Sequence, residues 1–242
     1  MAQLFISDLH LSPGRPEILR LFLDFLLGPA RQAEALYILG DLFEYWPGDD
    51  DLADPFNHGI AKALAACASG GTRVSFVRGN RDFLVGKEFA AACSLQLLDD
   101  PIQVDLPDGG VILSHGDALC TDDAAYQEFR ARVRSADWSA AFLARPLSER
   151  KREIETLRAR SEAEKRVKPL AIMDVNELAV ADLFHRYGCS RLIHGHTHRP
   201  ARHELTVDDR HCERWVLADW YDSGSYLLVD PNGIRAVAWP SA

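Results

Sequence analysis

Side chains that can bind a divalent metal follow five short apolar runs of the sequence. They are Asp8, His10, Asp41, Asn80, His115, His196 and His198. Carboxylate, amide and imidazole ligands, without thiolate, suit Mn²⁺, Fe²⁺, Mg²⁺ or Zn²⁺. Seven candidates are too many for one ion, but they suit two ions about 3.5–4 Å apart that share one carboxylate. The residue types therefore predict a dinuclear site.

The apolar runs have the length and composition of strands that are covered on both faces. They are Leu4–Ile6, Leu36–Leu39, Val74–Val77, Val111–Leu113 and Leu192–His194. Helical spacing over Pro16–Leu27 and Asn57–Ala68 separates the first three runs, which predicts an α/β fold with a layered sheet. Because ligands bind at the carboxyl ends of strands in such sheets, the candidate ligands should converge. Glycines beside four of them allow sharp turns and close approach to the metals.

After about residue 202 the pattern changes. Trp215–Leu217, Tyr226–Val229 and Ile234–Trp239, with a turn at Pro231-Asn232-Gly233, predict an antiparallel hairpin end.

The composition limits the classes of protein to which this chain can belong. The chain has 242 residues, 47% hydrophobic and 26% charged, which are the values of a globular protein that can form a single domain over 1–242. The formal net charge of −9 disfavours a nucleic-acid partner. The five scattered cysteines contain no CxxC pair, so we expect reduced, buried thiols and a cytoplasmic protein. We expect no signal peptide and no transmembrane helix, which leaves peripheral membrane attachment open.

One stretch has the opposite charge. Residues 130–168 contain 12 Lys or Arg and 6 Asp or Glu, a local balance of +6. This pattern is compatible with a solvated pair of helices or with a cationic cap that meets an anionic ligand.

Each ligand motif is weak alone, but together they identify a resemblance. Asp8-Leu9-His10, Gly40-Asp41, Gly79-Asn80-Arg81-Asp82, His115-Gly116 and Gly195-His196-Thr197-His198 resemble the motifs of calcineurin-like metallophosphoesterases. The resemblance spans about residues 1–200 and implies a four-layer αββα sandwich. It implies one ion on Asp8, His10, Asp41 and His198, and another on Asp41, Asn80, His115 and His196. Asp41 would then bridge the ions, and Asp41, Asn80 and His115 would be catalytic.

One position departs from the wider family pattern. Most members carry His after the Asn, as a proton donor to the leaving group, whereas this chain has Arg81. Arginine cannot give up a proton at neutral pH but binds phosphate with two hydrogen bonds. The change suits a leaving group that needs little protonation, such as a phosphate.

Finer motifs resemble the branch of the family that hydrolyses the pyrophosphate bond of UDP-2,3-diacylglucosamine in lipid A biosynthesis. They are Gly40–Glu44, Gly79–Phe83, Cys120–Asp123, Ala171–Asn176 and Ile193–Pro200. This resemblance implies a Mn²⁺-dependent enzyme with two ions per chain. Water activated by the ions would attack the α-phosphorus, giving UMP and 2,3-diacylglucosamine 1-phosphate. An inserted helical lid at about 121–170 would cover the metals. The implied substrate-binding residues are Asn80, Arg81, Asp123, Ser161, Lys165, Lys168 and His196.

The acyl chains of such a substrate need an apolar groove, contact with the membrane surface, or both. Trp138, Phe142, Leu143 and Leu147 are the groove candidates, with helix core as the alternative. The implied location is the cytoplasmic face of the inner membrane, with no obligate protein partner indicated. The alternatives are another nucleotide-sugar pyrophosphatase or phosphodiesterase on the same centre, a phosphoprotein phosphatase, and a scaffold that has lost its metals. Arg81 and the lid argue against the phosphatase, and the complete ligand set argues against the scaffold.

Overall fold

The computed structural model describes all residues except 1, 107–108, 166–169 and 241–242, and it leaves the side chains at 160, 162–165 and 170–171 undescribed. The strands are β1 Gln3–Ile6, β2 Ala35–Leu39, β3 Arg73–Val77, β4 Gln96–Leu98, β5 Ile102–Leu106, β6 Gly109–Ser114, β7 Arg191–His194, β8 Ala201–Val207, β9 Arg210–Val216, β10 Gly224–Asp230 and β11 Gly233–Trp239. The α-helices are α1 Pro16–Leu27, α2 Pro55–Ser69, α3 Lys87–Cys93, α4 Ala124–Val133, α5 Ala136–Leu143, α6 Leu147–Lys165 and α7 Glu177–Tyr187. Short 3₁₀ helices lie at Ala30–Gln32, Asp49–Ala53, Asp117–Leu119 and Leu170–Met173.

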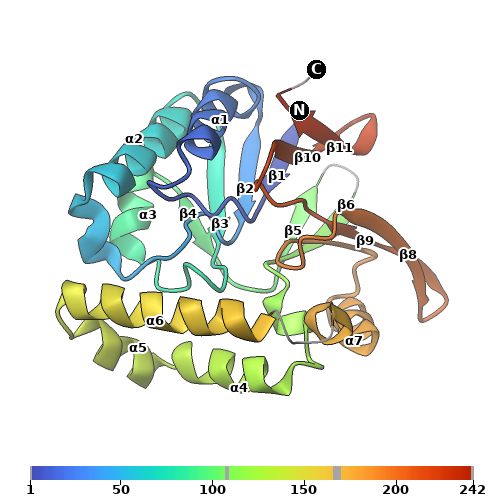
Figure 1. Ribbon diagram of the computed structural model, residues 1–242. Coiled ribbons are helices and arrows are strands. Elements are labelled where there is room, and N and C mark those ends of the chain that lie inside the picture. The colour runs from blue at the N-terminus through green and yellow to red at the C-terminus, as the bar shows by residue number, and fades with distance from the viewer. Residues whose placement is uncertain (1, 107–108, 166–169, 241–242) are drawn as a thin grey trace.

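Two mixed sheets form the centre of the molecule (Figure 1). Their strand orders are β11-β10-β1-β2-β3-β4 and β5-β6-β7-β9-β8. In the first sheet, β1, β2, β3 and β4 run parallel, and in the second, β6, β7 and β9 do so. The carboxyl ends of these parallel strands carry the candidate ligands.

Three apolar clusters separate four layers. In β1, Leu4 and Ile6 pack with α1–α3, whereas Phe5 between them packs in the cluster that joins the two sheets. In the second sheet, Leu192 packs with Val180 and Phe184 of α7. A strand that is buried on both faces has no polar side to present, which explains the continuous apolar runs. The expected αββα sandwich is confirmed.

The five expected ligand-bearing strands and the two expected helices are present, and α1 has the expected bounds. The hairpin of β10 and β11 turns at Pro231-Asn232, as expected. The expectation that Trp215–Leu217 belongs with that hairpin is wrong. Trp215 lies in β9, which pairs with β7 and β8 in the other sheet, because the segment after Val216 crosses from one sheet to the other.

Helices α4, α5 and α6 lie along one side of the sandwich, beside the loops at the ends of its strands (Figure 1). Asp123 caps α4 by accepting a hydrogen bond from the backbone N–H of Tyr126, and Ser135 caps α5 through that of Trp138. The helices fall within the segment 121–170 for which the sequence predicts a lid. Their action as a lid remains a proposal.

Candidate metal centre

The seven candidate ligands meet at one end of the two sheets. Ligand atoms of Asp8, His10 and His198 lie within 4.8 Å of one another, and so do those of Asp8, Asp41 and His115. The loops that carry them are held together by backbone hydrogen bonds. The N–H of Asp8 donates to the carbonyl of Gly40, and that of His10 donates to the carbonyl of Asp41. These bonds continue the parallel pairing of β1 and β2 beyond the strands.

Asn80 joins the imidazoles on the other side of the cluster. Its Oδ1 atom lies 2.9 Å from Nε2 of His115 and 2.7 Å from Nδ1 of His196. The two carboxylate oxygens of Asp41 face different neighbours. Oδ1 lies 3.7 Å from Nε2 of His115, and Oδ2 lies 3.8 Å from Nε2 of His10. Asp41 therefore stands between two groups of ligands, which is the place a bridging carboxylate needs.

Five of these candidate ligands have left-handed backbone conformations. The φ angles are 56° for Asp8, 50° for His10, 53° for Asp41, 68° for His196 and 54° for His198. Each such residue costs on the order of 1–3 kcal/mol and persists only where the surrounding structure imposes the conformation, and residues of this kind concentrate at functional sites. The residue types of the ligands do not reveal this strain.

Two glycines allow the loops to approach each other. A Cβ atom on Gly79 would lie 2.1 Å from Oδ1 of Asp41, and one on Gly195 would lie 2.3 Å from Oδ2 of Asp8. Both distances are shorter than any contact between a carbon and an oxygen that are not bonded to each other. The two glycines therefore let the ligand-bearing loops pack against each other, and close approach of the backbone to the metals remains a prediction.

Asp82 fixes two of the loops that carry candidate ligands, a role that its residue type alone does not predict. Its carboxylate is fully buried and accepts backbone hydrogen bonds from Asp41, Leu42, Phe43 and Gly79 at 2.7–3.3 Å. The loop after β2 is thereby tied to the loop after β3. Its place in the tetrapeptide Gly79–Asp82, which contains a candidate ligand, is the feature of the sequence that could have indicated this role.

We expect Asp82→Ala to lower the free energy of unfolding by on the order of 4 kcal/mol, because it leaves several buried N–H groups without an acceptor. Urea denaturation measures this change. Asp54→Ala is the matched control, since Asp54 caps α2 through one N–H and should cost about 1 kcal/mol. Equal losses of unfolding free energy in the two variants would show that Asp82 contributes no more than a helix N-cap does.

Burial and neighbouring charges shift the pKa values in opposite directions. Burial lowers the pKa of His196 to about 3 and that of His10 well below its usual value, so both imidazoles are neutral. Burial also opposes charge on His115, but the carboxylates of Asp41 and Asp8 raise its pKa to about 9. Burial and the carboxylates of Asp82 and Asp8 raise the pKa of Asp41. The metal-free cluster thus holds protons that a bound cation would displace.

The donor set fits a divalent metal centre. The Asp8 and Asp41 side chains are no more than 2% exposed and lie close together, which is unfavourable without a compensating cation. Nε2 of His10 faces the other candidate ligands, 3.5 Å from Nε2 of His198 and 3.8 Å from Oδ2 of Asp41. Oxygen and imidazole ligands of this kind bind Mn²⁺, Fe²⁺, Mg²⁺ and Zn²⁺.

The expected substrate-binding residues lie in different parts of the structure, and two of them are not fully described. Asn80 and His196 lie in the centre, and the backbone N–H of Arg81 donates to Oδ1 of Asp41 at 2.8 Å. Asp123 is the buried N-cap of α4, and Ser161 is a half-buried residue of α6. Lys168 and the side chain of Lys165 lie outside the described residues.

Helix α4 is anchored directly behind the ligands. Oδ2 of the fully buried Asp117 accepts hydrogen bonds from Tyr126, Arg130 and Arg134, four residues apart on one helix face. Arg134 also donates to the carbonyl of Gly79 at 2.9 Å, and the Tyr126 ring is stacked 6.0 Å from that of His196. The sequence pattern gave no indication of this anchor, although Asp117 lies two residues after a candidate ligand.

Most described cations of the basic stretch pair with carboxylates, many of them in the sandwich. The pairs are Arg130 and Arg134 with Asp117, Arg145 with Glu153, Arg150 with Asp50, Lys151 with Asp51 and Arg158 with Glu44. These cations therefore serve first to attach the helices. A simply solvated helical pair does not describe these paired cations, and contact of this stretch with an anionic ligand remains a proposal.

The apolar groove candidates differ in burial. Phe142 is 4% exposed and stacks on Trp138, which in turn contacts Phe83 of the sandwich. These two side chains pack α5 against the sandwich, as the helix-core alternative expects. Leu147 is half-buried, and Leu143 is 41% exposed. A role of these residues in binding acyl chains remains a proposal.

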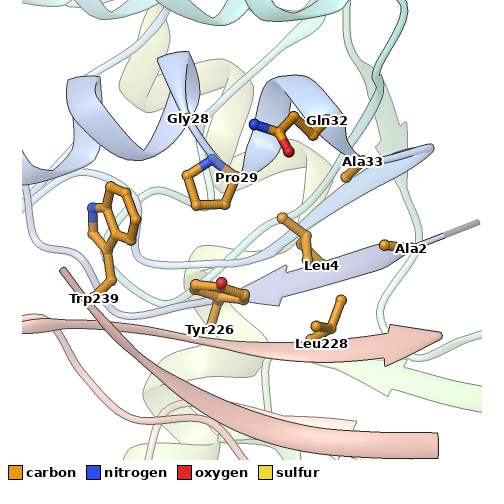
Figure 2. Close-up of a pocket in the computed structure, with 9 residues that line it drawn as sticks. All are labelled: Ala2, Leu4, Gly28, Pro29, Gln32, Ala33, Tyr226, Leu228 and Trp239. Carbon is orange, nitrogen blue, oxygen red and sulfur yellow. The ribbon is translucent and has the colours of Figure 1, made fainter. Parts of the chain in front are cut away.

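A pocket of about 470 Å³ lies beside β1, β10 and the segment after α1 (Figure 2). It is lined by Ala2, Leu4, Gly28, Pro29, Gln32, Ala33, Tyr226, Leu228 and Trp239. None of the candidate ligands borders it. The pocket is therefore not the candidate reactive site, because the candidate metal ligands lie elsewhere.

Two further expectations concern cysteines and membrane spans. All five cysteines are free and buried, as expected. Within the described residues, no helix combines the length and the apolar character needed to cross a membrane.

Comparisons with known proteins agree with this geometry. A UDP-2,3-diacylglucosamine hydrolase from Aromatoleum aromaticum is 57% identical over 233 residues, which cover 96% of this chain and 95% of that protein. One from Escherichia coli O127:H6 is 47% identical over 240 residues, covering 99% of this chain and all of that protein.

The solved structure of vacuolar protein sorting 29 from Cryptosporidium parvum superposes with a TM-score of 0.50 at 11% identity. It covers 98% of this chain and 95% of its own, and it shows likeness of fold alone. The model of the calcineurin-like phosphoesterase family matches residues 1–200. The chain therefore belongs to the calcineurin-like phosphoesterase family.

Proposed function

We propose that this protein hydrolyses the pyrophosphate bond of UDP-2,3-diacylglucosamine to UMP and 2,3-diacylglucosamine 1-phosphate. The observation that carries the proposal is full-length similarity to relatives that bear this hydrolase name, at 47–57% identity. The site supports it, because a buried set of carboxylate, amide and imidazole ligands suits metal-assisted hydrolysis of a phosphate anhydride.

The proposed metals are two Mn²⁺ ions. Asp8, His10, Asp41 and His198 would hold one, and Asp41, Asn80, His115 and His196 the other. When bound, such ions supply positive charge that stabilises phosphoryl oxygens and lowers the pKa of water. The position of Asp41 between the two groups of ligands supports its role as the shared carboxylate.

Arg81 is proposed to hold the pyrophosphate beside the metal ligands. Its backbone is fixed by the hydrogen bond to Asp41, and its side chain is 10% exposed at the edge of the cluster. A guanidinium remains charged at neutral pH, so it binds a phosphate but does not protonate the leaving group. Phosphate is a leaving group that does not require such a proton.

Helices α4–α6 are proposed to cover the substrate, with Asp123, Ser161, Lys165 and Lys168 among its contacts. The proximity of Tyr126 to His196 and of Arg134 to Gly79 supports this placement, since both contacts join α4 to the ligand loops. An acylated substrate further suggests peripheral attachment to the cytoplasmic face of the inner membrane.

Product analysis tests the proposed reaction. The protein is incubated with Mn²⁺ and either UDP-2,3-diacylglucosamine or the acyl-free UDP-N-acetylglucosamine, and the products are identified by mass spectrometry. We expect UMP and the diacylated sugar phosphate from the first substrate and little turnover of the second. Equal turnover of both would favour a general nucleotide-sugar pyrophosphatase, and no turnover of either would refute the proposal.

Activity should fall as the pH drops below about 6, because protons compete with metal for the imidazoles. The His115 pKa of about 9 implies that metal binding at neutral pH displaces a proton. Apparent Mn²⁺ affinity should therefore rise by about tenfold per pH unit while one proton is released. Calorimetry in buffers of different ionisation enthalpy measures this proton release. Excess Mn²⁺ should move the acidic limb of activity to lower pH, whereas a limb independent of Mn²⁺ would indicate a different titrating group.

A further inference from the structure

Glu44 lies between a candidate metal ligand and the longest helix of the proposed lid. Its backbone N–H donates to the carbonyl of Leu11 at 3.0 Å, and Leu11 pairs with Phe43 in a parallel bridge. These contacts fix Glu44 beside the loop that carries His10. The Glu44 side chain is 16% exposed, so its carboxylate is directed largely by protein neighbours.

One carboxylate oxygen of Glu44 faces His10. Nε2 of His10 points into the ligand cluster, 3.5 Å from Nε2 of His198 and 3.8 Å from Oδ2 of Asp41. Nδ1 points away from the cluster and lies 3.6 Å from Oε2 of Glu44. An imidazole that binds a metal through Nε2 carries its proton on Nδ1, and a carboxylate near that atom fixes the tautomer and the ring orientation.

The other oxygen faces two arginines. Oε1 of Glu44 accepts a hydrogen bond from Nη2 of Arg158, in α6, at 2.6 Å. Nη1 of Arg81 lies 3.9 Å from the same oxygen. Arg158 also lies over the ring of Tyr45, which restricts its position. One carboxylate thus contacts a metal ligand, the proposed phosphate-binding arginine and the lid helix.

We propose that Glu44 is a positioning residue that orients His10 for metal binding, and that Arg158 acts on the metal centre by holding Glu44. The lid helix α6 would then support the affinity of the ion on the His10 side before any substrate binds. This inference rests on the metal centre of the proposed function. It adds a residue outside the ligand set and a physical link from the lid to the metals.

The test measures Mn²⁺ binding to metal-free full-length protein by calorimetry, without substrate. Glu44→Gln keeps the size of the side chain and should weaken one of the two Mn²⁺ sites by about 10–100-fold. Arg158→Ala should weaken the same site by about fivefold, the lower end of usual couplings. Arg158→Lys keeps the charge and should recover part of the affinity.

Lys151→Ala is the matched control. Lys151 is on the same helix, is 31% exposed against 33% for Arg158, and pairs with Asp51 at 2.6 Å. Asp51 contacts Asn57 rather than a metal ligand. The control should therefore loosen α6 to a similar degree while leaving both Mn²⁺ affinities within twofold of the wild type. Equal losses in Lys151→Ala and Arg158→Ala would overturn the inference, because general packing of the helix would then explain both.

The double variant Glu44→Gln/Arg158→Ala tests the route of the effect. If Arg158 acts only through Glu44, the double variant should bind Mn²⁺ as Glu44→Gln does. Additive losses, or unchanged affinity in Glu44→Gln with its fold intact by circular dichroism, would refute the proposed link. Failure of wild-type protein to bind Mn²⁺ would refute the proposed metal centre. Normal Mn²⁺ binding without turnover of the UDP-sugar would refute only the proposed reaction.

Discussion

Asp41→Ala should reduce kcat/KM by at least about 10³-fold, since losing an ion removes several kcal/mol of transition-state stabilisation. The reason is geometric. Asp41 directs one oxygen toward His115 and the other toward His10, so its removal affects both groups of ligands. Metal analysis of the purified variant should find at most one ion per chain. Two bound ions with a tenth or more of wild-type kcat/KM would contradict the bridging role.

Asp41→Asn separates loss of metal from loss of fold. Burial and nearby carboxylates raise the Asp41 pKa from 3.8 to about 7, so the folded metal-free protein binds this proton more tightly than the unfolded chain does. The ionised group therefore costs stability, and this cost grows as the pH rises from about 4 to 7. Metal-free Asp41→Asn should be at least as stable as the wild type at pH 7 while remaining inactive. A large drop in its thermal midpoint would indicate a structural role instead.

The sequence predicts the strands that carry the ligands because each is buried on both faces. It does not predict β8, whose residues from Ala201 to Glu204 are exposed, or β4, which has three residues. Such segments become strands because a neighbouring strand supplies hydrogen bonds, not because of their own apolar pattern. For the same reason, the sequence could not assign Trp215 to the correct sheet.

The candidate ligands were predicted from residue types and positions, and the structure brings them together. The side chains that hold these candidate ligands in place are set by tertiary contacts between residues far apart in the sequence. Glu44 and Arg158 are 114 residues apart, and Arg150 is 100 residues from Asp50. An excess of positive charge over 130–168 therefore could not reveal whether the cations face solvent, a ligand or the carboxylates of the sandwich. The left-handed conformation of Asp8 or His198 is likewise imposed by the surrounding loops.

Gly79→Ala should have the second large effect, although it adds only one methyl group. The new carbon would lie 2.1 Å from Oδ1 of Asp41 and 2.3 Å from its backbone nitrogen. Because the second contact is with backbone, a side-chain rotation cannot relieve it, and the loops after β2 and β3 must separate. Their separation would strain the hydrogen bonds that Asp82 makes to both loops. Asn80 and Asp41 would then lose their relative positions.

A displacement of about 1 Å at a reactive site can cost about 100-fold in rate, so we expect Gly79→Ala to lower kcat/KM by at least that factor. Steady-state kinetics and metal content measure the result. Gly59→Ala is the control, because Gly59 lies within α2 and its added carbon would meet no atom within 4 Å. That variant should keep its activity and gain up to about 1 kcal/mol of stability from the better helix former. If Gly79→Ala instead kept half of the wild-type activity with both metals bound, the ligand loops could shift apart without harm, and close packing at Gly79 would not be what positions Asp41.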